Sequence, residues 1–518
     1  MWSGHEMQGM PVSGAALGAL ALQLPALLVG AEARSHRLPS EDEVFMVASL
    51  ETDLCVIGAG SGGLAVAAGA AQMGADVVLI EKGRMGGDCL NYGCVPSKSL
   101  IAAAKAAHAI RHAGRFGVNG HEPEIDFQAI HDHVKGVIAT IAPHDSQERF
   151  EGLGVRVIRA PARFVGLQEI EADGGRIHAR RIVVATGSSP AVPPIPGLAE
   201  VPHLTNETVF DLTELPEHLI VIGGGPIGCE LAQAFRRLGA AVTVLELFSI
   251  LPKDDPAAVG VVRAQLRADG VDLREHVEVK AVARDGNGIA VTIKEDVERR
   301  IIGSHVLVAA GRRVNVDGRD LEAAGIEYGP KGIKVDARLR TSNRRAYAIG
   351  DVVGGLQFTH MAAHHASVVI KNALFRLPAK VDDRAVPWVT YTEPELAHVG
   401  LTEDLAKERG VAVQALRWPY QENDRAQAER ETAGFAKALV DRRGRIHGAT
   451  IVGERAGELI QPWVLAISSG IKIGAMAQLI APYPTFGEVS KRAAGSYYTP
   501  KLFSERTRKL VRFLMRFP

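Results

Sequence analysis

The sequence predicts an α/β fold built on two Rossmann-type dinucleotide-binding domains. The prediction rests on a succession of elements that occurs twice: a strand, a glycine-rich turn, a helix and a second strand. The first copy begins at residue 52 and the second at residue 219. A further observation is the string GGDCLNYGCVPSK at residues 86–98, which holds two of the four cysteines of the chain. Two nucleotide fingerprints and a clustered thiol pair predict two bound dinucleotides and redox-active sulfur.

The first fingerprint begins with a short buried strand at residues 52–58 (TDLCVIG), which leads through the turn GAGSGG into an alanine-rich helix. The next strand, residues 75–81, ends in an acid. In this context the glycines allow a tight turn and close approach of a pyrophosphate, and the acid can hold an adenosine ribose. The predicted ligands are Gly58, Gly60, Gly63 and Glu81.

The second fingerprint begins at Leu219 and reads VIGGGPIGCE over residues 221–230, before a helix to Leu238 and a strand over 242–246. Its predicted ligands are Gly223, Gly225, Gly228, Glu230 and Glu246. A carboxylate at Glu246 accepts hydrogen bonds from a free ribose 2′-OH and repels a 2′-phosphate. NADH is therefore favoured over NADPH, and the nearby Lys253 keeps NADPH as the less favoured alternative.

The two clustered thiols, Cys89 and Cys94, precede a predicted helix over residues 97–113. They can close a short disulfide near the helix N-terminus, where the helix dipole lowers the pKa of a thiol. Chemistry between dinucleotides and a disulfide requires a flavin and a nicotinamide. We therefore predict FAD and NADH as the cofactors.

A structural zinc site would need four ligands, and the two remaining cysteines stand alone in other predicted elements. The histidine pairs His131/His133 and His364/His365 have no carboxylate or thiol partner at ligand spacing and are expected on helix surfaces. No metal site is predicted.

With 518 residues, 59 basic and 59 acidic side chains and 47% hydrophobic residues, the chain is long enough for several domains with ordinary cores. The charge balance gives no global basic surface, which excludes nucleic acid as a partner. Few cysteines, two of them clustered, indicate sulfur that cycles in a reducing cytoplasm rather than a secreted disulfide scaffold.

The N-terminus contains an apolar run at residues 11–30 that superficially resembles a signal peptide. No Lys or Arg precedes this run, and Pro25 makes it a poor membrane helix. We interpret Met46 as the natural start and expect residues 1–49 to be a disordered extension.

The string at residues 86–98 resembles the redox-disulfide motif of the class I pyridine nucleotide-disulfide oxidoreductases, the family of dihydrolipoamide dehydrogenase, glutathione reductase and mercuric reductase. The resemblance covers roughly residues 50–500 and implies a homodimer with an α+β C-terminal dimerisation domain. The implied domains are the FAD-binding domain at 50–190 and 316–385, the NAD(P)-binding domain at 191–315 and the interface domain at 386–503. Residues 504–518 lie beyond the part of the chain that the resemblance covers and are expected to form a basic amphipathic helix.

The resemblance also implies roles for single residues. Cys94 is the implied flavin-side thiol and Cys89 the implied interchange thiol, while Lys98 and Glu230 are expected to pair beside flavin N5. The further cofactor ligands that it implies are Lys98, Ala162, Thr186, Gly187, Asp351, His360 and, in the exit turn of the nicotinamide domain, Gly311.

The segment YPTFGE at residues 483–488 lies where most family members carry His-Pro-Thr-x-x-Glu. Glu488 matches, whereas Tyr483 replaces the histidine that serves as acid and base from the partner subunit. A phenol with a pKa near 10 is a poor proton acceptor at neutral pH. Mercuric reductase also has a tyrosine near this position but ends in two cysteines, and this chain has no cysteine after Cys229. The predicted catalytic residues are Cys89, Cys94, Glu488 and Tyr483.

The resulting expectation is an enzyme that passes electrons from NAD(P)H through FAD to a Cys89–Cys94 disulfide and on to a disulfide or thiol-bound acceptor. Two alternatives are a metal ion or oxidant reduced at the dithiol, and an electron donor or redox sensor for a membrane partner. The tail at residues 506–517 (RTRKLVRFLMRF) predicts a basic amphipathic helix, which lies on an anionic membrane or packs on the interface domain or the other subunit. The expected location is cytoplasmic, with membrane association as a further option.

Overall fold

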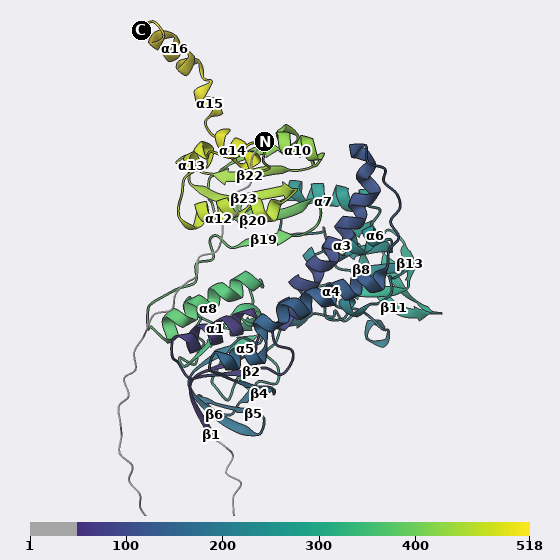
Figure 1. Cartoon of the computed structure of the whole chain (residues 1–518), viewed down its shortest axis with the longest axis vertical. Helices are drawn as coiled ribbons and strands as arrows, with labels where there is room; N and C mark the ends of the chain where they lie inside the picture. The colour runs from purple at the N-terminus through teal and green to yellow at the C-terminus, as the bar shows by residue number, and fades with distance from the viewer. Residues whose placement is uncertain (1–48) are drawn as a thin grey trace, which may run out of the picture. The chain divides into compact units, whose positions relative to one another are not determined.

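The computed structural model describes residues 49–518. The predictions of a disordered N-terminal extension and of a natural start at Met46 concern residues outside this range. Within the described range, the order of elements follows the predicted α/β pattern (Figure 1).

The first sheet has seven strands in the order β3-β2-β1-β6-β5-β4, with β18 pairing with β6. Its strands are β1 (Ser49–Ile57), β2 (Val77–Ile80), β3 (Val155–Ile158), β4 (Ala162–Phe164), β5 (Glu169–Ala172), β6 (Gly175–Val184) and β18 (Ala346–Ala348). Strand β1 is parallel to β2 and β6, so that Leu54 lies opposite Val77 and Arg181. Because β18 follows the second fingerprint in sequence, this sheet is completed by two distant parts of the chain.

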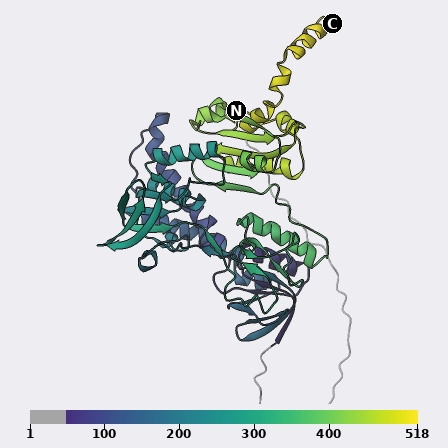
Figure 2. The same ribbon diagram turned by 180° about the vertical axis from the view of Figure 1, so that it is seen from behind.

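Helices α1 (Ser61–Gln72) and α8 (Thr359–Ala373) lie side by side on this sheet, as Figures 1 and 2 show. Apolar residues of both helices, including Val66 and Val369, join Leu79 of the sheet in one buried cluster. The N-termini of both helices consequently face the strand ends at which the first glycine turn lies.

The second sheet is parallel and has the order β10-β9-β8-β14. Its strands are β8 (His218–Ile222), β9 (Ala241–Glu246), β10 (Asp272–Glu275) and β14 (His305–Val308). Around it lie α6 (Pro226–Leu238), α7 (Pro256–Ala268) and the antiparallel strands β11 (Glu278–Asp285), β12 (Gly288–Lys294) and β13 (Glu298–Gly303). The chain enters and leaves this region through β7 (Ser188–Pro190) and β15 (Arg312–Val314), which pair antiparallel.

A long helix, α3 (Cys94–His112), carries the thiol motif toward the second sheet and packs on α6. Leu100 and Ala104 of α3 share a buried cluster with Phe235 of α6. Helices α2 (Gly87–Asn91), α4 (Phe127–Ile141) and α5 (Gln147–Gly152) complete this part of the chain. The thiol motif is thus held by both nucleotide-binding regions.

The C-terminal region contains an antiparallel sheet in the order β19-β20-β23-β22-β21. Its strands are β19 (Pro387–Thr390), β20 (Glu395–Gly400), β21 (Gln414–Pro419), β22 (Phe435–Val440) and β23 (Ile446–Gly453). Its helices are α9 (Glu403–Glu408), α10 (Asp424–Glu429), α11 (Ala456–Leu459), α12 (Gln461–Ser468), α13 (Ile473–Gln478), α14 (Glu488–Gly495), α15 (Thr499–Leu502) and α16 (Glu505–Leu514). Trp463 is fully buried in the core of this region.

Most predicted elements agree with the structure, with two differences. Helix α3 starts at Cys94 rather than near Ser97, so the second thiol belongs to the first helical turn. His365 is buried, not on the helix surface as expected, because it lies with Met361 and Val369 on the packed face of α8. Its Nδ1 accepts a hydrogen bond from Gly350 N at 3.1 Å. No helix within residues 49–518 has the length and apolar character needed to cross a bilayer.

Candidate active site

The two glycine turns have the same backbone geometry. Gly58 has φ +108° and Gly223 has φ +113°, a region that side chains rarely adopt. A Cβ atom on Gly63 would lie 1.8 Å from the Gly58 carbonyl oxygen, and one on Gly228 would lie 2.0 Å from that of Gly223. Each helix therefore starts so close to its strand that only glycine fits, which exposes the backbone amides of the turn to a pyrophosphate.

The acid that ends each second strand is also held in the same way. Glu81 Oε2 accepts a hydrogen bond from Ala59 N at 2.6 Å. Glu246 Oε2 accepts one from Gly224 N, also at 2.6 Å. Both carboxylates are thus fixed beside their glycine turns, where the fingerprint places the ribose of a dinucleotide.

A cavity of about 1600 Å³ extends from one turn to the other past the two cysteines. Most of the predicted site residues line it: Gly58, Gly60, Glu81, Cys89, Cys94, Lys98, Ala162, Thr186, Gly187, Gly223, Gly225, Glu230, Glu246, Gly311, Asp351 and His360. Gly63 and Gly228 lie behind its wall and act through the close packing described above. The cavity has room for two dinucleotides placed against a common pair of thiols.

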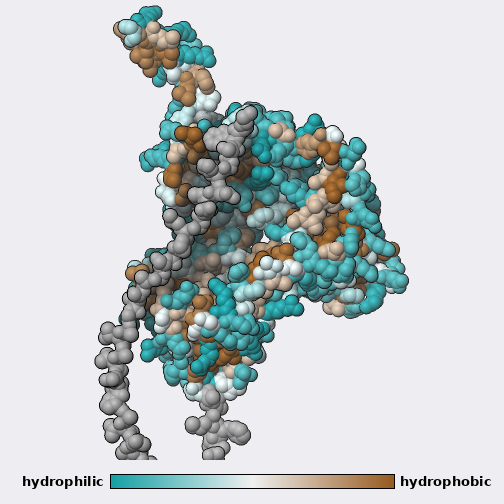
Figure 3. All heavy atoms as spheres, in the orientation of Figure 1, coloured by the Kyte–Doolittle hydropathy of each residue, from teal (hydrophilic) through white to brown (hydrophobic). Residues whose placement is uncertain are grey.

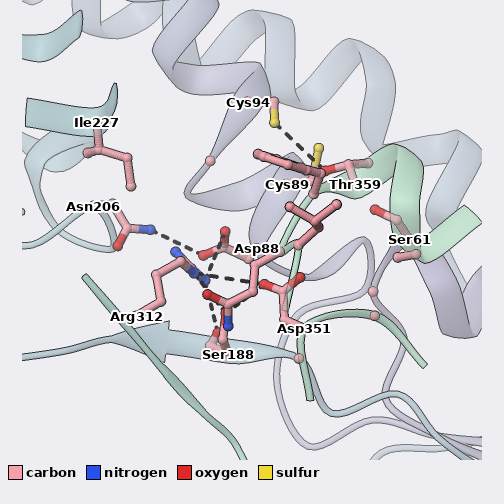
Figure 4. Close-up of a pocket in the computed structure, with 18 of the residues that line it drawn as sticks. Ser61, Asp88, Cys89, Cys94, Ser188, Asn206, Ile227, Arg312, Asp351 and Thr359 are labelled. Carbon is pink, nitrogen blue, oxygen red and sulfur yellow. Dashed lines mark hydrogen bonds and ion pairs between the residues drawn. The ribbon is translucent and has the colours of Figure 1, made fainter. Parts of the chain in front are cut away.

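Cys89 in α2 and Cys94 in α3 are both free thiols in this structure and lie close to Thr359 (Figure 4). The pKa of Cys94 is lowered to about 6, first by a hydrogen bond from Cys89 and further by the charge of Lys98. Thr359 Oγ1 lies 3.8 Å from Cys94 Sγ and lowers this pKa as well. The pKa of Cys89 is raised, because its thiol donates to Cys94 and is partly buried. The opposite shifts of the two pKa values favour the proton on Cys89 and the negative charge on Cys94.

An ion pair lies next to the thiols. Lys98 Nζ in α3 is 2.7 Å from Glu230 Oε2 in α6, and the Glu230 side chain is only 7% exposed. The other oxygen of Glu230 accepts a hydrogen bond from Tyr391 N at 2.9 Å. The Lys98 ammonium also lies 4.3 Å from the centre of the Tyr391 ring. These contacts fix the cation beside Cys94, where it favours the thiolate.

A hydrogen-bonded network on the other side of the dithiol loop was not predicted (Figure 4). Arg312 Nη2 lies 3.2 Å from Asp88 Oδ2, and Arg312 Nε donates to Ser188 Oγ at 2.7 Å. Ser188 Oγ in turn donates to Asp351 Oδ2 at 2.6 Å, and Asn206 Nδ2 donates to Asp88 Oδ1 at 3.1 Å. Asp88 directly precedes Cys89, so this network ties the thiol loop to β7, β15 and the carboxylate of Asp351.

Two observations show that the part of the cavity beside the first glycine turn fits FAD. Arg319 Nε is buried without a hydrogen-bond partner, and Arg319 lines the cavity together with Glu81 and Ala162. Burial also raises the pKa of Asp351, a carboxylate that sugar hydroxyls can satisfy. A bound flavin dinucleotide would supply a partner for the unpaired Arg319 Nε and a further partner for the buried carboxylate of Asp351.

Tyr483 and Glu488 do not line the cavity of this chain. Tyr483 is 70% exposed, and its hydroxyl donates to Asp424 Oδ2 at 3.0 Å. This hydrogen bond raises the pKa of the phenol. Glu488 is the first residue of α14. Neither of these two predicted catalytic residues is therefore brought to the dithiol by its own chain.

Comparison with known proteins agrees with this geometry. The family model described as pyridine nucleotide-disulphide oxidoreductase matches residues 52–366, and the model of its dimerisation domain matches residues 386–494. The chain belongs to the pyridine nucleotide-disulphide oxidoreductase family. This result confirms the resemblance and the fold class that the sequence predicted.

Similar members of the family have different names. The chain is 36% identical to mercuric reductase of Streptomyces lividans over 454 residues, which cover 86% of this chain and 96% of that protein. It is 35% identical to dihydrolipoyl dehydrogenase of Staphylococcus aureus over 454 residues, with the same coverage of 86% and 96%.

Two solved structures are also similar. LpdA from Mycobacterium tuberculosis has a TM-score of 0.79 and 31% identity and covers 86% of this chain and 99% of its own. The HOCl-induced flavoprotein disulfide reductase RclA from Escherichia coli has a TM-score of 0.77 and 29% identity, with coverage of 86% and 99%. The chain is accordingly a FAD-dependent NAD(P)H disulfide oxidoreductase with a dimerisation domain at its C-terminus.

Proposed function

We propose that this oxidoreductase uses NADH, stores the electron pair as the Cys89–Cys94 dithiol and delivers it to a disulfide or thiol-bound acceptor. The observation that carries the proposal is the position of the two thiols, beside Thr359 and the Lys98–Glu230 ion pair, in a cavity that joins both nucleotide turns. The pKa is lowered for Cys94 and raised for Cys89. Such a pair has one sulfur suited to charge stabilisation and one suited to exchange.

Bound FAD would accept a hydride from the nicotinamide and supply two electrons to the disulfide. The Cys89–Cys94 bond breaks, Cys94 stays a thiolate beside Lys98, and Cys89 takes up a proton. Once deprotonated, Cys89 attacks one sulfur of the acceptor disulfide and releases the other as a thiolate. Cys94 then attacks Cys89, which restores the internal disulfide and releases the second acceptor thiol.

The preference for NADH is proposed from Glu246. Its carboxylate is fixed at the end of β9, and it would meet the ribose hydroxyls of the bound coenzyme. A 2′-phosphate would bring two negative groups together at this position. Lys253 also lines the cavity and is the nearby residue that could offset this repulsion.

We further propose a homodimer in which the partner subunit presents its own copy of the 483–488 segment to the dithiol. The match to a dimerisation domain supports this arrangement, as do the exposure of Tyr483 and its separation from the cavity of its own chain. A reducing cytoplasm is the proposed compartment, since the cysteine content favours sulfur that cycles.

A metal ion is the second candidate acceptor. Several similar relatives are mercuric reductases, and one similar structure is a Cu(II) complex of RclA. A thiolate next to a thiol is a ligand pair that soft metal ions prefer. In this case the ion is the substrate, bound by the reduced cysteines and reduced as their disulfide re-forms.

The acceptor can be identified by reducing the pure enzyme with NADH without oxygen and then adding one candidate at a time. Lipoamide, glutathione disulfide, Hg²⁺, Cu²⁺ and a quinone should be compared, with return of the absorbance spectrum of the oxidised enzyme as the readout. We expect a disulfide to reoxidise the enzyme fastest. Faster reoxidation by a metal ion would favour the second candidate, and a response to the quinone alone would indicate an electron donor for a membrane partner.

A further inference from the structure

The C-terminal helix α16 (Glu505–Leu514) is the largest feature that the proposed function leaves unused. Its N-cap residue is Ser504, whose Oγ accepts a hydrogen bond from Thr507 N at 3.3 Å. No residue of α15 or α16 is buried. The helix follows the segment matched by the dimerisation-domain model and makes no packed interface with the described part of its own chain.

The helix has two distinct faces. At about 100° per residue, Leu510, Val511, Phe513 and Leu514 fall on one arc. The exposed fractions of these side chains lie between 46% and 56%. Arg508, Lys509 and Arg512 fall on the other arc. Arg506, in the first turn, falls at the edge of the apolar arc, and Arg516 lies just beyond the end of the helix. Figure 3 shows apolar side chains gathered on one side of this projecting segment.

The charge of the helix selects the kind of surface that it can contact. Five basic residues fall within 506–516, and Glu505 is the one acid between 505 and 518. Within the described part of the chain, one of these cations forms an ion pair: Lys509 Nζ lies 3.9 Å from Glu505 Oε2 of the same helix. Two copies of this helix packed through their apolar arcs would leave the cations of both copies without a further acidic partner. A surface that is negative outside and apolar beneath fits both faces at once.

The short length of α16 also indicates that its apolar face is covered by another surface. A helix of ten residues is marginal in water unless its apolar face is covered. We propose that α16 lies on an anionic phospholipid surface, with its apolar arc in the head-group boundary, and holds the reductase at a membrane. This inference does not depend on which acceptor the enzyme uses.

The test is vesicle flotation of the full-length, FAD-loaded protein. Vesicles of phosphatidylcholine alone should be compared with vesicles that also contain phosphatidylglycerol. We expect flotation with the anionic vesicles and its loss at high salt. In the variant R508Q/K509Q/R512Q, three charges are lost at roughly 1 kcal/mol each, which weakens binding on the order of 100-fold.

Matched variants separate the helix from the rest of the surface. The charge control is K280Q/R299Q/R300Q, three exposed basic residues of β11 and β13, and it should float like the unchanged protein. The apolar variant F513S/L514S should bind at least tenfold more weakly. Its control is L167S/V297S, which replaces two equally exposed apolar residues elsewhere.

Three results would overturn the proposal. The first is equal flotation of the charge variant and its control, and the second is equal binding to neutral and anionic vesicles. The third is a weaker dimer of F513S/L514S in analytical ultracentrifugation with no change in vesicle binding. That last outcome would place the apolar face on the partner subunit instead.

Discussion

At the scale of single residues, the pKa of the Cys94 thiol is lowered by Cys89, Lys98 and Thr359. Its pKa of about 6 results first from the Cys89 hydrogen bond, so the thiolate persists above this pH and is lost as the pH falls below it. In the NADH-reduced enzyme we expect a long-wavelength absorption band from the Cys94 thiolate to FAD, with a midpoint near this value.

Replacing the donor should move that midpoint. In Cys89→Ala the hydrogen bond disappears, and the pKa of Cys94 should rise toward the ordinary thiol range. The measurement is the band intensity of the oxidised variant as a function of pH. Cys89→Ser, which keeps a hydroxyl donor, should shift it less. A band that survives in Cys94→Ser would show that the flavin-side thiol is assigned wrongly.

Glu246 gives the second prediction at this scale. We expect kcat/KM to be higher with NADH than with NADPH. The variant Glu246→Ala loses the hydrogen bonds from the ribose hydroxyls of NADH, each worth about 1.5–3 kcal/mol for a charged acceptor, so the difference in kcat/KM between the coenzymes should become smaller. Lys253→Ala is the comparison, since removal of the nearby cation should widen the difference. Equal kcat/KM for the two coenzymes in the unchanged enzyme would contradict this account.

At the scale of elements, the contact between a strand end and a helix start can be tested at the second turn. In Gly228→Ala the new Cβ would lie 2.0 Å from the Gly223 oxygen, so α6 must shift. We expect NADH binding to fall at least tenfold while FAD stays bound, as measured by coenzyme titration and flavin absorbance.

The control for that change is Gly260 in α7, where an added Cβ meets nothing within 4 Å. Gly260→Ala should leave NADH binding unchanged and stabilise the protein by about 0.5–1 kcal/mol, because alanine is the better helix former. Similar loss of NADH binding in both variants would mean that the turn geometry is not the cause.

The elements also show how far sequence reasoning extends. Both glycine turns and their acids could be predicted, because each lies in one short segment with fixed spacing. The contacts of Asp88 with Arg312 and Asn206 could not, since each joins residues far apart in the chain. The ring of Tyr391 over Lys98 is of the same kind. The burial of His365 results from the packing of α8 on α1, two helices that are far apart in the sequence.

At the scale of the whole molecule, the proposed homodimer places Tyr483 of one subunit near the dithiol of the other. If the partner subunit presents this residue to the dithiol, Tyr483→His should raise turnover of lipoamide or glutathione disulfide, because an imidazole exchanges protons near pH 7. Tyr483→Phe should have little effect. The idea of a missing base is wrong if Tyr483→His changes nothing and Tyr483→Phe abolishes the native activity.

In the proposed electron path, electrons from NADH reach the Cys89–Cys94 pair before any acceptor arrives. Anaerobic rapid mixing of the enzyme with one equivalent of NADH tests this order of steps, with absorbance and thiol titration as readouts. We expect the long-wavelength band to appear while two new thiols become titratable per chain. Full bleaching of the flavin with no band and no gain in thiols would contradict it.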